Sequence, residues 1–345
     1  MNPKNPYPHE ISFDQHIWLP RANANYNSLA NASHDRKDIQ SLIENTFPEV
    51  RDPSGAHPPF VELYLQQALS ADETDKVKAK CAELGWTDSP YDQLRAATHF
   101  FDDLREKIGL SAVNPPEHIH RMQRGECYVG DVYSANLIFN TLRRRDLRFE
   151  NGKRYLDFGC SSGSLIRILT AVMKDASFFG VDPIESAIEW ATANIPAGTF
   201  LKSELSPPLA FQDGFFDGVT AISIWSHLGE KEALRWFDEM NRCVKPGGWL
   251  LFTTHGRVSV SYYNLREMHL PKRILATLEG LLNSDFVFEE TYLGQSPEGI
   301  DATGYGNAYL TREWVLKNLT GKWRMLSVDF GANQENQDVY LLRRM

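Results

Sequence analysis

The spacing of hydrophobic residues divides the chain into regions. Residues 1–60 carry eight of the eighteen prolines and little periodic apolar pattern, which predicts an irregular N-terminal arm. In residues 61–125, apolar side chains recur at helical spacing, with breaks at Gly85 and Pro90. This region is expected to be a helical lid or accessory segment. A further helix is predicted over Tyr133–Arg145.

From Arg154 onward, short apolar runs alternate with amphipathic helices, which predicts an α/β fold with a mostly parallel, Rossmann-like sheet covered on both faces. We expect about seven strands, and the last two should form an antiparallel C-terminal hairpin beyond a helix over Thr311–Leu319. Eight segments are candidates for the strands of this sheet, one more than the seven expected: Arg154–Phe158, Ser177–Val181, Thr199–Lys202, Gly218–Ile224, Trp249–Thr254, Phe286–Tyr292, Met325–Phe330 and Asp338–Arg343.

Composition narrows the class of protein. Hydrophobic residues make up 42% and charged residues 23%, as in soluble globular proteins, and no apolar run reaches the ~20 residues of a membrane span. The start of the chain lacks a signal-peptide pattern, and the four cysteines show no paired spacing, so a cytoplasmic protein without disulfides or a metal site is expected. The net charge of -9 argues against a nucleic-acid partner.

A strand that runs directly into a turn of small residues is the first chemical signal. Tyr155–Phe158 leads into Gly159-Cys160-Ser161-Ser162-Gly163, and a helix follows. Small side chains let the backbone approach a ligand closely, and the start of the helix offers free amide donors. A ligand should therefore lie over this turn.

Two carboxylates accompany the turn. Asp157 lies at the end of the first buried strand, where a cationic amino group is a suitable partner, although capping of the next helix is the alternative role. Asp182 ends the second strand, where a carboxylate can accept hydrogen bonds from both hydroxyls of a ribose. A nicotinamide cofactor would use the same geometry, but its fingerprint needs three glycines, whereas only Gly159 and Gly163 frame this turn.

Together these residues resemble the class I S-adenosylmethionine-dependent methyltransferases. The resemblance is strongest over residues 154–256, and it includes Leu156–Gly163, Gly180-Val-Asp-Pro183, Phe216–Val219 and Val244–Trp249. It implies S-adenosyl-L-methionine as cofactor and a methyltransferase domain over residues 126–345, with 257–305 as an insertion on the acceptor side. The residues implied in cofactor binding are Asp157, Gly159, Cys160, Ser161, Gly163, Asp182, Pro183, Ser203, Glu204, Ser223 and Trp225.

Four of these residues need comment. Ser161 replaces the middle glycine of the family's first motif, and Ser203 or Glu204 stands where the family commonly has an acidic residue beside the adenine. Trp225 could pack on the adenosine or the acceptor, but an aromatic residue at the end of a strand is also a common core residue.

Two histidines are candidates for a general base. His227 follows the fourth predicted strand and His255 the fifth, so both should lie at the carboxyl edge of the sheet and open toward one crevice. Histidine suits the deprotonation of a hydroxyl acceptor because its unperturbed pKa lies near neutrality. For each of them, hydrogen bonding to neighbouring backbone is an equally good explanation.

The acceptor side is expected further along the chain. The sequence Gly304–Thr311 predicts a glycine-rich aromatic loop in which Tyr305 and Tyr309 could bind the substrate. The alternative is that both tyrosines only pack within the loop. This loop and Gln337–Tyr340 resemble methyltransferases that act on sugars and other small polar molecules.

The predicted function is methyl transfer to a small-molecule or glycan hydroxyl. Ser223–His227 lacks the Asn/Asp-Pro-Pro-aromatic turn that would suggest methylation of nucleic-acid bases. A homodimer is compatible with this interpretation. The alternatives are a non-catalytic protein that keeps the cofactor fold as a binding or scaffold module, and a nicotinamide-dependent oxidoreductase.

Overall fold

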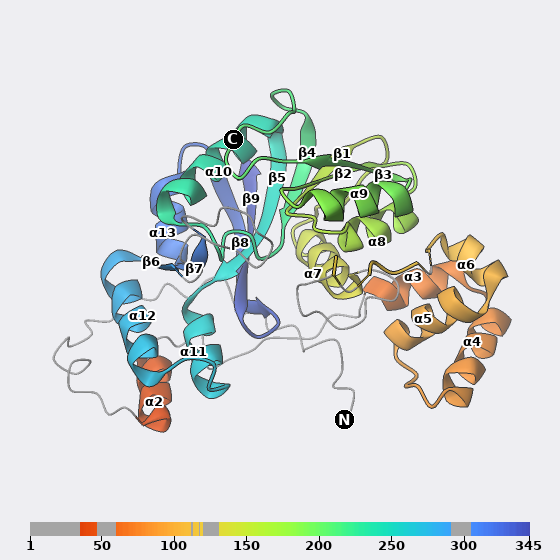
Figure 1. The fold of residues 1–345 in the computed structure, drawn as a ribbon, viewed down its shortest axis with the longest axis horizontal. Coiled ribbons are helices and arrows are strands. Elements are labelled where there is room, and N and C mark those ends of the chain that lie inside the picture. Colours follow the sequence, from red (N-terminus) through yellow and green to blue (C-terminus); the bar gives the residue numbers. More distant parts are fainter. Residues whose placement is uncertain (1–34, 47–59, 112, 117, 120–130, 291–304) are drawn as a thin grey trace. The chain divides into compact units, whose positions relative to one another are not determined.

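The computed structural model describes residues 35–46, 60–111, 113–116, 118–119, 131–290 and 305–345. The chain forms two compact units, one of residues 57–220 and one of residues 1–56 with 221–345 (Figure 1). Each unit is described by itself.

The unit of residues 57–220 is built on four parallel strands in the order β3-β2-β1-β4. In this arrangement Asp157 of β1 lies opposite both Gly180 of β2 and Thr220 of β4. The first strand of the motif is therefore central within the unit. The strands are β1 (Arg154–Phe158), β2 (Ser177–Asp182), β3 (Gly198–Lys202) and β4 (Phe216–Ala221).

Helices α8 (Ser164–Val172) and α9 (Glu185–Asn194) pack against these strands (Figure 1). The approach of α8 to β2 is so close that a Cβ atom on Gly180 would lie only 2.7 Å from Cys160 Sγ and 2.8 Å from Ile166 Cδ1. Glycine at this strand position permits the tight packing. Helix α7 (Val132–Arg143) begins at Asp131, whose carboxylate accepts the Ser134 amide at 2.9 Å and caps the helix.

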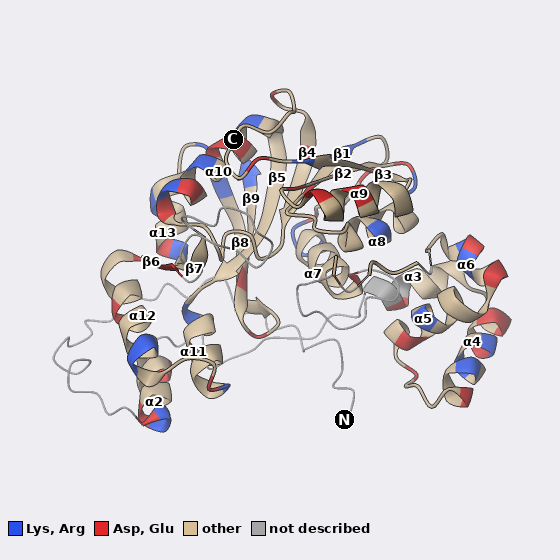
Figure 2. Ribbon diagram, viewed as in Figure 1, with Lys and Arg blue, Asp and Glu red and all other residues tan. Residues whose placement is uncertain are grey.

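The region between residues 60 and 108 is helical, as its periodicity predicts. It contains α3 (Phe60–Ala68), α4 (Ala71–Glu83), α5 (Pro90–Phe100) and α6 (Asp102–Ile108), and α4 begins with a reciprocal Ser70–Glu73 capping box. The Tyr64 hydroxyl donates to the carbonyl of Ile108 at 2.6 Å and ties α3 to α6. Figure 2 shows acidic and basic residues interspersed over α4 and α6, the pattern of a solvated helical surface.

The other unit is centred on β5 (Val244–His255). Strand β9 (Gln337–Arg344) pairs with β5 antiparallel and also pairs with β8 (Trp323–Asn333), so the predicted C-terminal hairpin is confirmed. On the other side, β7 (Gly306–Leu310) pairs with β5 in parallel and with β6 (Phe286–Glu290) antiparallel. Helices α10 (Glu230–Cys243) and α13 (Arg312–Leu319) pack on β5 and β8 respectively.

The segment expected to be an aromatic loop contains strand β7, and this corrects the prediction. The reason lies at Gly306, where a Cβ atom would stand 2.1 Å from the carbonyl oxygen of Glu289 on β6. The glycine therefore marks a close approach of two strands rather than a flexible turn.

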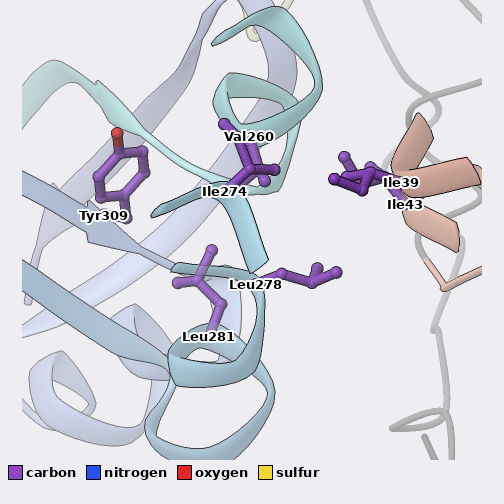
Figure 3. Close-up of a cluster of buried hydrophobic side chains, with 7 residues drawn as sticks. All are labelled: Ile39, Ile43, Val260, Ile274, Leu278, Leu281 and Tyr309. Atoms are coloured by element: carbon purple, nitrogen blue, oxygen red, sulfur yellow. The ribbon is translucent and has the colours of Figure 1, made fainter. Parts of the chain in front are cut away.

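The N-terminal arm also departs from its prediction, because it contains helix α2 (Arg36–Thr46). Ile39 and Ile43 of α2 are fully buried and join side chains of α11 (Arg257–Leu265) and α12 (Pro271–Ser284) in one hydrophobic cluster (Figure 3). The Arg36 guanidinium donates to the carbonyl oxygens of Asn264 and His269 at 3.0 and 2.8 Å. A segment that looks irregular in sequence is thus ordered by tertiary contacts.

The fold class predicted from the sequence is confirmed: the sheet is mostly parallel, its C-terminal strands are antiparallel, and helices flank it. The described residues form nine strands, including β7. The two compact units meet in the sequence between residues 220 and 221. Among the helices that the structure describes, none is long and apolar enough to cross a bilayer.

Candidate functional site

The turn after β1 has the backbone that its small residues predict. Gly159, Ser161 and Gly163 have φ angles of 80°, 49° and 74°, all in the left-handed region. At Gly163 a Cβ atom would lie 2.7 Å from the ring of Phe200, so glycine is required for space as well as for conformation. Ser161 adopts the same conformation without being glycine, which is unfavourable for a residue with a Cβ.

Asp182 offsets the strain at Ser161. Its Oδ2 accepts the Ser161 amide at 2.8 Å, its Oδ1 accepts the Ile184 amide at 3.0 Å, and its backbone carbonyl accepts the Ser203 amide at 3.0 Å. One buried carboxylate therefore organises the turn after β1 and the start of α9. Because each carboxylate oxygen can accept more than one hydrogen bond, this role is compatible with binding a ribose diol as well.

Asp157 is 6% exposed and lies at the centre of the four strands. Its Oδ1 accepts the Thr220 hydroxyl at 3.1 Å. Thr220 could not be recognised as this partner from the sequence, because 63 residues separate it from Asp157. A buried carboxylate beside small-residue backbone fits the positive amino group of an amino-acid ligand, so the donor set of this unit suits an adenosyl amino acid.

Four other expected cofactor residues differ in exposure. The Cys160 thiol is buried against Gly180, and burial holds its pKa well above the usual value, so this residue offers its backbone rather than its side chain. Ser203 is buried, Pro183 is partly exposed and Glu204 is exposed. Ser203 is fixed to Asp182 through its amide, whereas nothing in the described structure assigns a role to Glu204.

In the unit built on β5, the structure brings the two candidate histidines together, with 6.4 Å between their ring centroids. Nδ1 of His227 lies 2.9 Å from the carbonyl oxygen of Gly306, and its ring stacks on Tyr305 at 5.4 Å. A carbonyl can only accept, so Nδ1 of His227 carries the proton and Nε2 carries the lone pair. Removal of the ring from solvent lowers the pKa of His227.

His255 has a different environment. It is 4% exposed, and its Nε2 lies 2.9 Å from the Tyr263 hydroxyl. Burial first, and then the neighbouring His227, lower the pKa of His255 to about 3. A histidine so enclosed, with Nε2 engaged by a tyrosine, has the features of a structural residue more than of a base that must reach an acceptor.

The three aromatic candidates, Trp225, Tyr305 and Tyr309, differ in how deeply they are buried. Trp225 is fully buried, stacks on Phe237 at 4.4 Å and donates its indole N–H to the carbonyl of Ala233, so it occupies the core position that was its alternative. Tyr309 is fully buried too, and its hydroxyl lies 3.3 Å from Nε2 of His269. Only Tyr305 of the two predicted substrate tyrosines is partly exposed.

Ser223, Thr253 and Gln337 are joined by hydrogen bonds that no pattern in the sequence indicated. Ser223 lies directly beyond β4, and its hydroxyl accepts a hydrogen bond from Gln337 of β9 at 2.6 Å. Its amide donates to Thr253 of β5 at 2.8 Å. The only hint of these contacts in the sequence is that Thr253 and Gln337 are polar residues in predominantly apolar strand segments.

Comparison with known proteins finds a methyltransferase-domain match over the region that contains these residues. Residues 133–288 match the sequence model of a methyltransferase domain, a span that includes the turn, both carboxylates and both histidines. The cofactor of this domain is S-adenosyl-L-methionine, as the motifs predict.

Curated relatives match over shorter stretches. A ubiquinone biosynthesis O-methyltransferase from Thiobacillus denitrificans is 32% identical over 115 residues, which is 32% of this chain and 48% of that protein. A phthiotriol/phenolphthiotriol dimycocerosates methyltransferase from Mycobacterium ulcerans is 31% identical over 105 residues, covering 30% and 38%. The chain thus spans about half or less of the length of these relatives.

Solved structures that align with part of this chain include a SAM-dependent methyltransferase from Methanosarcina mazei. The two are 20% identical, the alignment covers 57% of this chain and 94% of that chain, and the TM-score is 0.40. Another from Aquifex aeolicus has 15% identity, covers 67% and 99%, and also has a TM-score of 0.40.

Proposed function

We propose that the protein transfers the methyl group of S-adenosyl-L-methionine to a hydroxyl of a small-molecule or glycan acceptor. The methyltransferase-domain match supports the cofactor and the reaction class. An oxygen acceptor is supported by the O-methyltransferase named among the relatives and by the tautomer of His227.

The main structural support for an oxygen acceptor is the 2.9 Å hydrogen bond between His227 Nδ1 and the Gly306 carbonyl. It fixes the neutral imidazole with its lone pair on Nε2, the form that a general base needs. The lowered pKa of His227 keeps this form dominant at neutral pH.

The proposed roles of the residues follow from this. Asp157 holds the amino group of the cofactor, Asp182 holds its ribose hydroxyls, and the Gly159–Gly163 turn lies against its methionine part. When bound, the cofactor supplies a sulfonium methyl group for an in-line displacement. Nε2 of His227 would take the proton of the acceptor hydroxyl as that oxygen bonds to the methyl carbon and the carbon–sulfur bond breaks, so that S-adenosylhomocysteine would be the leaving group. The protein would align the two reactants and exclude water.

The test is a turnover assay with radiolabelled methyl donor and a panel of phenols, catechols and simple glycosides. In a His227→Asn variant the amide can still donate to Gly306 but cannot take a proton, so we expect the rate to fall by about 10²–10⁴ while cofactor affinity stays unchanged. The affinity for the cofactor should likewise stay unchanged in His255→Asn.

Binding of S-adenosylhomocysteine without turnover of any acceptor would instead support a scaffold role. Saturable binding of NADH at the same site would support an oxidoreductase.

A further inference from the structure

The chain leaves β4 through an unfavourable backbone conformation. Ser223 has a φ of 64°, in the left-handed region that costs a residue with a Cβ roughly 1–2 kcal/mol. Glycine would adopt this conformation without the penalty. Such strain persists only where surrounding contacts fix the backbone more firmly than the strain opposes it.

The contacts that fix Ser223 form a closed ring of hydrogen bonds. The Ser223 amide donates to Thr253 Oγ1 at 2.8 Å. The Thr253 hydroxyl donates to Gln337 Oε1 at 2.6 Å. Gln337 Nε2 then donates to Ser223 Oγ at 2.6 Å. The residue at position 337 must offer both a hydrogen-bond donor and an acceptor, and the side-chain amide of Gln337 provides both.

Asn333 adds a further hydrogen bond to this ring. Asn333 Nδ2 donates to Gln337 Oε1 at 3.0 Å, so this oxygen accepts two hydrogen bonds. Thr253 is fully buried, and Gln337 and Asn333 are 6% and 5% exposed. Hydrogen bonds in such a dry environment are strong, and loss of one partner leaves the others unsatisfied.

The ring is connected to His227 through the backbone between them. The Ser226 hydroxyl donates to the Ser223 carbonyl at 2.7 Å. The carbonyls of Ser226 and His227 then accept the amides of Ala308 and Gly306 of β7, at 2.8 and 2.9 Å. The segment from Ser223 to His227 is therefore held from β5 and β9 at its start and from β7 at its end.

We infer that Gln337 is a positioning residue, which acts through Ser223 to hold the His227 imidazole on the Gly306 carbonyl with its lone pair on Nε2. The catalytic meaning of this inference rests on the proposed function, whereas the geometric part does not. The strain at Ser223 is retained because a glycine there would remove the Oγ that accepts from Gln337.

The test compares two variants that break the ring with one that does not. Gln337→Met keeps the length of the side chain but removes both the donor and the acceptor. Thr253→Val keeps the shape and removes only the hydroxyl, which covers the case in which the first variant does not fold. The control is Tyr340→Phe, on the same strand as Gln337, since the buried Tyr340 hydroxyl has no hydrogen-bond partner among the described residues.

The first readout is NMR of protein labelled with ¹⁵N in its histidine imidazoles, with the His227 signal assigned by His227→Asn. We expect one Nδ1-protonated tautomer in the wild type and in Tyr340→Phe, and a mixture of tautomers in Gln337→Met and Thr253→Val. A single unchanged tautomer in both ring variants overturns the inference.

The second readout is turnover with the acceptor found in the panel assay. We expect kcat to fall by about 10–100-fold in the ring variants with the KM for S-adenosyl-L-methionine unchanged, because misplacement of a reacting group by ~1 Å has effects of this size. A wild-type kcat in both variants also overturns the inference. If no acceptor is turned over by the wild type, the proposed function fails, and the NMR result still decides the geometric part.

Discussion

At the scale of single residues, the chemistry of the candidate site depends on which atoms already have hydrogen-bond partners. His227 and His255 are equivalent in the sequence, because each follows a strand of the sheet. In the structure the carbonyl of Gly306 fixes the tautomer of one, and the hydroxyl of Tyr263 engages Nε2 of the other. Residue type therefore identified the pair, and only their partners separate the two roles.

Ser161 shows the same point for the cofactor turn. A serine replaces glycine at a position with a φ of 49°, and the hydrogen bond from its amide to Asp182 stabilises that conformation. The departure from the family motif is therefore compensated by a carboxylate that the sequence assigned only to the ribose.

Burial of His255 makes the stability of the protein depend on pH. An unfolded histidine binds a proton below about pH 6.5, whereas His255 in the folded chain does so only near 3. Between these values the unfolded state binds more protons, so the free energy of unfolding rises with pH across this window and falls as the solution is acidified. For this one residue the loss between pH 7 and pH 5 is about 2 kcal/mol.

Urea denaturation at pH 7 and pH 5 measures this effect. In His255→Phe the difference in the free energy of unfolding between pH 7 and pH 5 should shrink by about 2 kcal/mol. The variant also removes the hydrogen bond between His255 and the Tyr263 hydroxyl, which lowers the stability at both pH values. Burial also lowers the pKa of His227 and His269, so the variant should still be less stable at pH 5 than at pH 7. An equal pH dependence in the variant and the wild type would contradict the assignment to His255.

At the scale of secondary-structure elements, local sequence predicted most of the helices and strands but not the docking of α2. Helices α4 and α5 carry N-caps that are visible in the sequence: the Ser70–Glu73 capping box of α4, and Ser89, which accepts the Asp92 amide at the start of α5. Helix α2 has only eleven residues, and isolated helices of this length are marginal in water. Its order comes from its contacts with α11 and α12.

The docking of α2 predicts a localised effect of mutation. Ile43 is fully buried in the cluster drawn in Figure 3, so Ile43→Ala should cost about 2–5 kcal/mol of packing free energy. We expect the amides of α2 to lose protection from hydrogen exchange while those of β5 keep theirs. Ser41→Ala, an exposed position on the same helix, is the control and should leave exchange unchanged. Unaltered protection of α2 in Ile43→Ala would show that the helix does not depend on this contact.

Strand β7 is the other element that the sequence did not reveal. Its glycine and aromatic residues are typical of loops, yet the backbone of β6 passes so close to Gly306 that no other residue fits. Close approach between segments is a property of the folded chain, and no local pattern encodes it.

At the scale of the whole molecule, binding of the cofactor should stabilise the folded chain by mass action. At a ligand concentration 100 times the Kd, the stabilisation is about 2.7 kcal/mol. S-adenosylhomocysteine should therefore raise the melting temperature of the wild type. Asp182→Ala should lose most of this shift, because the carboxylate is proposed to hold the ribose and also organises the turn at Ser161.

Each variant is compared with its own ligand-free form, so a lower intrinsic stability of Asp182→Ala does not affect the result. Glu189→Ala, at an exposed position of α9 in the same unit, is the matched control and should respond as the wild type does. A full shift in Asp182→Ala would remove this residue from the proposed cofactor site, and a shift caused by NADH would favour the nicotinamide alternative.

The sequence by itself determined the fold class, the Gly159–Gly163 turn and the carboxylates Asp157 and Asp182. These features depend on short segments whose hydrophobic period and small residues are visible locally. The tertiary structure decided the tautomer of His227, the burial of Trp225 and Tyr309, and the ring that joins Ser223 to Gln337 across 114 residues of sequence. Hydrogen bonds between distant strands and the exclusion of water from a side chain arise only when the chain has packed, so no local pattern could have supplied them.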